Sequence, residues 1–173
     1  MARTLAELNL CSRREFAAAL AHLFEGSPWV AREAFDRRPF RDARHLHAEL
    51  CAAVRRAPAA RRMALIKAHP DLAGRLATAG RLTPESAREQ ASSGLLELSA
   101  GEAAEFGRLN AAYRRRFGFP FIICARLNDR RAILSAMKSR ASKARGEEEQ
   151  AALAEIEKIA WLRLRDALQR EGG

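Results

Sequence analysis

The sequence predicts an all-α fold, a single-domain bundle of about eight helices over residues 1–173 with one extended apolar connector. Alanine, leucine and arginine are abundant whereas β-branched residues are sparse, a balance that favours helices over sheets. Helix start and stop residues recur along the whole chain. Only the apolar run at 119–125 lacks a helical period, and because no second strand is available to pair with it, we expect a connector.

The N-terminal helices are predicted from their first residues. Ser12 and Glu15 form an S-x-x-E capping box ahead of an apolar stripe. Pro28 suits the first turn of a short second helix. Asp42 is expected to cap a third helix, which carries Leu46 and other apolar residues along one side.

The later helices have equally clear boundaries. Pro58 is expected to open a helix that ends near Ala68 or His69, because the residue before Pro70 is pushed out of the α region. Thr83 begins the next helix, and Ser99 begins another that stops at Gly118. Two further helices are predicted near 129–140 and 147–169.

The chain is strongly basic, with 31 lysines and arginines against 21 acidic residues and a formal net charge of +10. Such an excess indicates an anionic partner, either a nucleic acid or a small anion, or else a solvated basic surface. The basic residues are interleaved with acidic ones, and aromatic residues are only 6% of the chain, too few for a base-stacking platform. We therefore do not expect nucleic-acid binding, although a basic helical nucleic-acid-binding module without enzymatic activity stays the alternative.

Neither the cysteines nor most of the histidines predict a metal site. Cys11, Cys51 and Cys124 form no C-x-x-C pair, and free thiols fit a reducing cytoplasm. His45 and His47 are two residues apart and point in different directions on a helix, so we expect a solvated helix face. No apolar run approaches the ~18 residues of a membrane span, so neither export nor a membrane association is expected.

Three groups of residues remain as candidates for chemistry. His69 lies at a helix end before Pro70, which restricts the backbone and would present the imidazole from a rigid turn; the alternative is a histidine bonded to nearby backbone. Ser86, Glu89 and Gln90 share one helix face, although solvated faces often carry such groups.

Arg163 is the third candidate. An arginine near the apolar side of the last helix needs an anionic partner, and a substrate carboxylate would bind its guanidinium in a bidentate manner. The alternative is a surface arginine whose stem packs on apolar neighbours.

These groups occur within segments that resemble one family closely, the 2-oxo-4-hydroxy-4-carboxy-5-ureidoimidazoline (OHCU) decarboxylases. The matching segments span nearly the whole chain: LFEGSPWVAREAFDRRPF at 23–40, KAHPDLAGRL at 67–76, LTPESAREQASSGL at 82–95, LNAAYRRRFGFPFIICAR at 109–126 and EIEKIAWLRL at 155–164. Two preferences of the family are not met, because Leu127 stands where glycine is common and the region of Lys143 lacks a frequent asparagine.

The resemblance implies cofactor-independent decarboxylation of OHCU to (S)-allantoin in urate degradation, by a cytoplasmic homodimer that uses no metal or organic cofactor. It implies that His69 is catalytic, and we expect Glu89 to share that role. It also implies a pocket for this small anionic substrate, lined by Pro70, Ser86, Ala87, Arg88, Glu89, Gln90, Phe121, Ile122, Ile123, Cys124, Ala125 and Arg163. An enzyme of the same fold with a different substrate is a further alternative.

The roles of the pocket residues can be predicted from their chemistry. We expect Arg163 to hold a substrate anion or ring oxygen, and Glu89 and Gln90 to hold the ureido and ring N–H groups. Main-chain N–H groups of residues 121–125 are expected to bind carbonyl oxygens, which would explain an extended connector in a helical protein.

Overall fold

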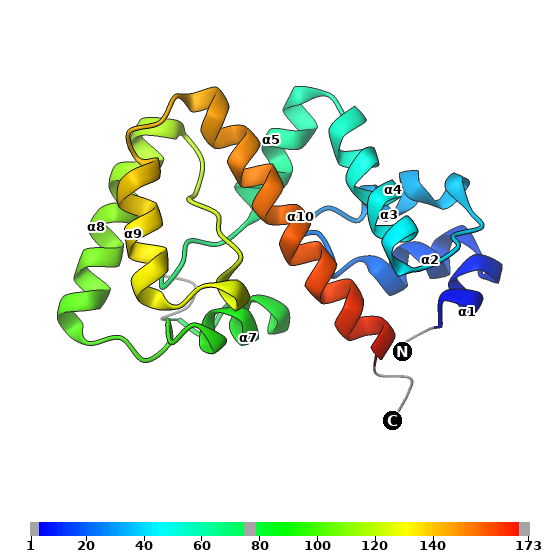
Figure 1. Ribbon diagram of the computed structural model, residues 1–173, viewed down its shortest axis with the longest axis horizontal. Helices are drawn as coiled ribbons and strands as arrows, with labels where there is room; N and C mark the ends of the chain where they lie inside the picture. The colour runs from blue at the N-terminus through cyan, green and yellow to red at the C-terminus, as the bar shows by residue number, and fades with distance from the viewer. Residues whose placement is uncertain (1–3, 75–78, 170–173) are drawn as a thin grey trace. The chain divides into compact units, whose positions relative to one another are not determined.

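The computed structural model describes residues 4–74 and 79–169. Within these ranges the chain forms nine α-helices, two short 3₁₀ helices and no strand, which confirms the all-α prediction (Figure 1). The helices are α1 (Leu5–Leu10), α2 (Arg13–Leu20), α3 (Trp29–Ala34), η1 (Phe35–Arg37), α4 (Ala43–Arg56), α5 (Ala59–Ala68), α7 (Pro84–Ser92), α8 (Ala100–Phe117), η2 (Ala125–Leu127), α9 (Arg130–Arg140) and α10 (Arg145–Gln169).

The chain divides into two compact units. The first unit consists of the residues up to Ala68, with α1 to α5, together with the chain from Glu157 onward. The second unit is His69–Ile156 and contains α7, α8, α9, η2 and the N-terminal part of α10. A single domain over residues 1–173 stays a prediction.

The first unit is built on local caps and a small apolar core. Ser12 and Glu15 form the predicted capping box at the start of α2, and Asp42 caps α4 by accepting the N–H of His45. Pro28 is the N-cap residue of α3, one position earlier than predicted. The ring of Phe16 stacks on that of Phe40 at 5.9 Å between centroids. Helix α5 ends at Ala68, which confirms the predicted end near Ala68 or His69.

The second unit begins at the residues that the sequence marks as helix starts. Thr83 caps α7, and Ser99 with Glu102 forms a capping box at the start of α8. Gly118 ends α8 in the left-handed region, at φ 77°, which glycine adopts without steric cost. Helices α8 and α9 pack side by side (Figure 1).

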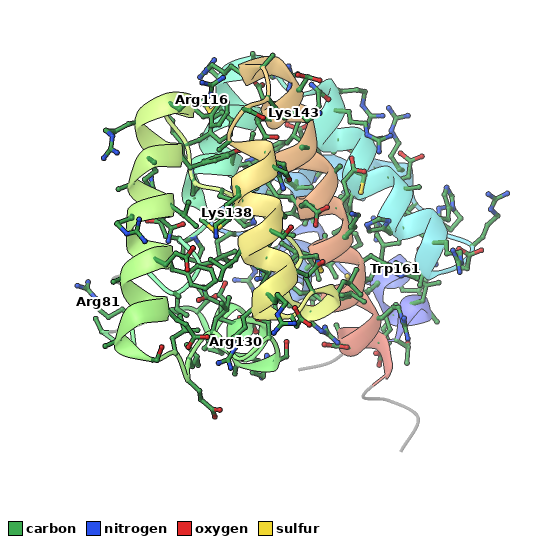
Figure 2. All side chains as sticks on the ribbon, turned by 60° about the vertical axis from the view of Figure 1, so that its left-hand side comes forward. Arg81, Arg116, Arg130, Lys138, Lys143 and Trp161 are labelled. Atoms are coloured by element: carbon green, nitrogen blue, oxygen red, sulfur yellow. The ribbon has the colours of Figure 1, made fainter. Side chains whose placement is uncertain are left out.

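Two ion pairs join the solvent side of α8 and α9. Lys138 Nζ lies 2.7 Å from Glu105 Oε1, and Arg130 Nε lies 3.4 Å from Glu102 Oε1. Figure 2 labels both basic residues on α9. Pairs as exposed as these contribute little to stability, so the apolar face of α9, with Ile133 and Met137 buried, holds the two helices together.

The apolar run at 119–125 is a connector, as predicted, because residues 119–124 form no regular secondary structure and η2 begins at Ala125. Phe119 and Phe121 are almost fully buried. Their ring centroids lie 6.1 Å and 5.3 Å from that of Tyr113 in α8. The aromatic rings thus bury an irregular backbone in the interior of the second unit.

Two boundary predictions need comment. The last helix begins at Arg145 rather than at 147, because the Glu147 carboxylate accepts the N–H of Ala144 and so supports an earlier start. The position of Asp71 also predicts an N-cap for a following helix, but residues 75–78 lie outside the described part of the chain.

Candidate active site

His69 follows α5 directly, and only 6% of its surface is exposed. It begins a short irregular turn, residues 69–74, which includes Ala73 at a φ of +50°. A non-glycine residue rarely adopts this left-handed conformation, so the surrounding structure must hold the turn in place. Three side chains from α7 and α8 do so.

Gln90 of α7 is the first of these side chains. Its Oε1 accepts the N–H of Ala73 at 2.8 Å, and its Nε2 donates to the carbonyl of Asp71 at 3.4 Å. Gln90 is buried, with 2% exposure. Through these two contacts Gln90 ties the turn to α7. Substrate binding by this amide stays a prediction.

Asn110 and Arg114 of α8 hold the same turn from a second helix. The Asn110 Nδ2 donates to the carbonyl of Leu72 at 2.8 Å. The Arg114 Nε lies 2.8 Å and 3.1 Å from the two carboxylate oxygens of Asp71. The backbone that follows the imidazole is therefore positioned by α7 and α8 together.

The predicted polar face of α7 is only partly buried. Ser86 and Gln90 are buried and Glu89 is half-buried, as expected for residues that share a face. Arg88 is exposed and pairs with Glu85 at 3.3 Å, so the structure does not bring it together with the buried pair. Ala87 and Pro70 are half-buried.

The charge of Glu89 acts on Cys124 of the connector. Helix α7 packs against η2, which follows Cys124 directly. Burial, together with the negative charges of Glu155 and Glu89, raises the pKa of the Cys124 thiol to about 11. The thiol is therefore protonated at neutral pH. The carboxylate of Glu89 is near enough to Cys124 to affect the pKa of its thiol.

The connector presents main-chain groups, but not all are available for a ligand. Among the N–H groups of residues 121–125, which were predicted to bind carbonyl oxygens, that of Cys124 donates to Glu155 Oε2 at 2.8 Å and thus already has a protein acceptor. Among the described residues, no protein acceptor receives the N–H of Ile122 or Ile123. Both residues are buried, and a buried N–H without an acceptor is rare in proteins.

Arg163 lies in the first unit, whereas the other predicted site residues lie in the second. It is 4% exposed, and its Nη1 lies 2.9 Å from the carbonyl of His22 and 3.1 Å from Glu25 Oε2. The anionic partner that a buried guanidinium requires is thus supplied at least in part by the protein. The sequence analysis missed Glu25, because no local pattern links positions so far apart.

The remaining histidines and cysteines have structural surroundings. The expectation of a solvated His47 is wrong, because its Nε2 lies 2.8 Å from the carbonyl of Glu157 and its ring packs on Trp161 at 5.3 Å. His45 accepts the N–H of Arg41 through Nδ1. Burial raises the pKa of the Cys51 thiol to about 12. In residues 4–74 and 79–169 no group of three or more metal-ligating side chains is present.

Sequence reasoning also missed a buried polar cluster beneath the connector. Tyr113 donates its hydroxyl to the Glu148 carboxylate, and that carboxylate pairs with Arg140. Glu148 resembles an ordinary acidic residue in the first turn of a long helix. One available indication was the spacing of Asn110 and Tyr113, three residues apart on the apolar face of α8.

Comparisons with known proteins identify the family of the chain. A family model described as OHCU decarboxylase matches residues 9–165. The OHCU decarboxylase of Amia calva is 40% identical over 163 residues, 94% of this chain and 93% of that protein. The Xenopus laevis enzyme of the same name is 36% identical over 164 residues, 95% of this chain and 94% of that protein.

Similarity extends to a solved structure. The crystal structure of an (S)-allantoin synthase superposes with a TM-score of 0.74 at 27% identity, covering 96% of this chain and 54% of that one. A family model and relatives that match nearly the full length together define a helical decarboxylase. The chain belongs to the OHCU decarboxylase family. This membership favours the enzyme over the nucleic-acid-binding alternative.

Proposed function

We propose that His69 and Glu89 carry the chemistry by which this member of the OHCU decarboxylase family acts on its substrate. The reaction itself follows from family membership: it is the decarboxylation of OHCU to (S)-allantoin, a carboxy-lyase step in urate degradation. The proposal concerns the catalytic role of each residue. The observation that carries the assignment is the tie between the turn of His69 and α7, the helix of Glu89, through Gln90.

The chemistry sets what the protein must supply. The carbon that loses CO2 adjoins a C=N bond, which can accept the electron pair of the breaking C–C bond. No external electron acceptor is then needed, so we propose a cofactor-independent reaction. The protein contributes positioning of the substrate and stabilisation of developing charge.

His69 is suited to proton transfer by its position. The imidazole stands on a turn that Gln90, Asn110 and Arg114 hold at successive residues. We propose that it takes the proton of the substrate hydroxyl, or protonates the enol-like intermediate on one face. Protonation on a single face would yield a single enantiomer of the product.

Glu89 is the second proposed catalytic residue. It is half-buried on α7, and its charge reaches the connector at Cys124. A carboxylate accepts hydrogen bonds only, so Glu89 suits the ureido and ring N–H groups of the substrate. The same contact would orient the substrate relative to the imidazole of His69.

The rest of the pocket is proposed from its hydrogen-bonding capacity. The N–H groups of Ile122 and Ile123 suit substrate carbonyl oxygens. Pro70, Ser86 and Ala87 would line the pocket beside them. Arg163, in the first unit, has five N–H donors and can therefore bind an anion in addition to Glu25. Its contact with the substrate stays a prediction.

The experiment compares His69→Ala and Glu89→Gln with His45→Ala as a matched control. We expect kcat/KM for OHCU to fall ~10²–10⁴-fold in the first two variants, as for the loss of a general acid or base. His45 lies in the other unit, so its variant should retain full activity. Circular dichroism during urate oxidation follows the enantiomer formed. A folded His69→Ala or Glu89→Gln variant with wild-type kcat/KM would remove that residue from the mechanism.

Assembly and location are proposals as well. We propose a homodimer, which light scattering at micromolar concentration tests directly. We propose a cytoplasmic location because Cys11, Cys51 and Cys124 are all free thiols, which suit a reducing compartment. In the described part of the chain no helix has the length and apolar character of a membrane span.

A further inference from the structure

The peptide groups of the connector must be oriented by side chains. It carries the main-chain groups proposed to bind substrate, yet in the described part of the chain no strand lies beside it to fix the direction of its peptide groups. Apolar packing of Phe119 and Phe121 buries the segment but does not orient N–H or C=O groups. Two charged side chains do orient them, one on each side of Ile123.

Arg140 holds the peptide group before Ile123. Its Nη1 donates to the carbonyl of Ile122 at 2.8 Å, and its guanidinium lies 4.4 Å from the centroid of the Phe121 ring. The Arg140 Nε also lies 3.2 Å and 3.0 Å from the two carboxylate oxygens of Glu148. Glu148, which is 1% exposed, in turn accepts the hydroxyl of Tyr113, so the guanidinium is itself held in place.

Glu155 of α10 holds the peptide group after Ile123. Its Oε2 accepts the N–H of Cys124 at 2.8 Å. A hydrogen bond from a backbone N–H to an ionised carboxylate is about twice as strong as a neutral one. Both peptide groups that flank Ile123 are therefore fixed by charged side chains from α9 and α10.

Peptide planarity transmits these contacts to Ile123 itself. Both peptide bonds are trans, and in a planar trans peptide the C=O of one residue and the N–H of the next point in opposite directions. Holding the carbonyl of Ile122 thus sets the direction of the Ile123 N–H, and holding the Cys124 N–H sets that of the Ile123 carbonyl. Ile123 then offers one donor and one acceptor in fixed directions.

We propose that Arg140 and Glu155 are positioning residues for the decarboxylation, which act through the main chain of Ile123 and do not touch the substrate. A paired donor and acceptor match the HN–C=O edge of a ureido or ring amide, which presents one acceptor and one donor side by side. This inference rests on the proposed function, because it takes the connector as part of the substrate site.

The test uses two variants of one residue in the full-length protein. Glu155→Ala removes the acceptor of the Cys124 N–H, whereas Glu155→Gln keeps an oxygen acceptor and removes only the charge. We expect kcat/KM for OHCU to fall about tenfold to hundredfold in Glu155→Ala, the loss expected for a misplaced binding group. We expect Glu155→Gln to stay within about threefold of the wild type, since the hydrogen bond is retained.

Controls separate positioning from general stability. Glu157→Ala removes a carboxylate of the same helix that pairs with Arg55, so the activity of this variant should be unchanged. Arg140→Lys keeps a positive charge, but lysine lacks the planar guanidinium that donates to the Ile122 carbonyl and the Glu148 carboxylate together. We expect kcat/KM to fall about tenfold in this variant. Lys138→Gln, on the same helix, should retain full activity. Rates are normalised to folded protein from urea unfolding curves.

The outcomes are distinct. A folded Glu155→Ala variant with wild-type kcat/KM overturns the inference, and so does equal impairment of Glu155→Ala and Glu155→Gln, because charge rather than an acceptor would then matter. If the wild type turns over OHCU and Glu155→Ala is unaffected, only this inference fails. If His69→Ala and Glu89→Gln leave turnover intact, the proposed site fails whatever Glu155 does.

Discussion

Two irregular segments of the second unit are held in place by different kinds of side chain. The turn at 69–74 and residues 119–124 of the connector both run without regular secondary structure among buried residues. The turn is held mainly by neutral amides, Gln90 and Asn110, with one half-exposed ion pair. The connector is held by charged groups, Arg140 and Glu155, the first of them paired with a buried carboxylate.

The two segments should differ in the free energy of unfolding that is lost when a supporting side chain is removed. A buried amide that disappears leaves neutral backbone groups unsatisfied, at ~1–3 kcal/mol. A buried charge that disappears leaves its partner as an uncompensated charge, at ~3–5 kcal/mol. The connector should therefore be the more fragile of the two segments, while the turn should tolerate substitution of its individual partners.

The largest effect is expected at the centre of the cluster beneath the connector. Glu148→Ala leaves the Arg140 guanidinium, whose side chain is 15% exposed, without its carboxylate. We expect the free energy of unfolding to fall by ~3–5 kcal/mol in urea denaturation. Glu149→Ala, at the next position, is the control and should change it little. A loss below 1 kcal/mol in Glu148→Ala would show that the connector does not depend on this charge.

An intermediate effect is expected in the turn. Gln90→Ala leaves the Ala73 N–H and the Asp71 carbonyl without their shared partner. We expect ~1–3 kcal/mol of destabilisation, again by urea unfolding. Activity should fall as well, because the turn carries His69. If Gln90→Ala costs more than Glu148→Ala, the comparison between neutral and charged support is reversed.

The smallest effect is expected at the solvent side of the turn. The Arg114 side chain is 44% exposed and that of Asp71 26%, so water screens their attraction. Arg114→Ala should cost only ~0.2–1 kcal/mol. The exposed neighbour Arg115→Ala serves as the control, and high salt should reduce the difference between the two variants. A salt-independent loss of several kcal/mol would contradict a screened ion pair.

The helical fold could be predicted closely because its determinants are local. The capping boxes at Ser12 and Ser99 and the proline start of α7 act over three or four residues, a separation that the sequence displays directly. The connector was predicted from the absence of a period and from the lack of a second strand. The segment motifs likewise indicated the family before any geometry was known.

The functions of individual polar residues were harder to predict. The contact of the Gln90 amide with the turn was not predicted, and the N–H of Cys124, which was expected to bind substrate, is accepted by Glu155. A helix face shows that a side chain is available, whereas its partner depends on which backbone lies opposite. Glu148 illustrates the same point, since only its burial beside Arg140 and Tyr113 distinguishes it from Glu147.

The sequence by itself determined where helices begin and end, which segment stays extended and which family the chain resembles, because each depends on residues near one another in the chain. Only the tertiary structure decided which buried polar group meets which. Arg163 pairs with Glu25 across 138 positions, and Arg140 reaches the carbonyl of Ile122 across 18. A buried charge or N–H must find a partner, but packing in three dimensions selects that partner, and one-dimensional spacing does not encode it.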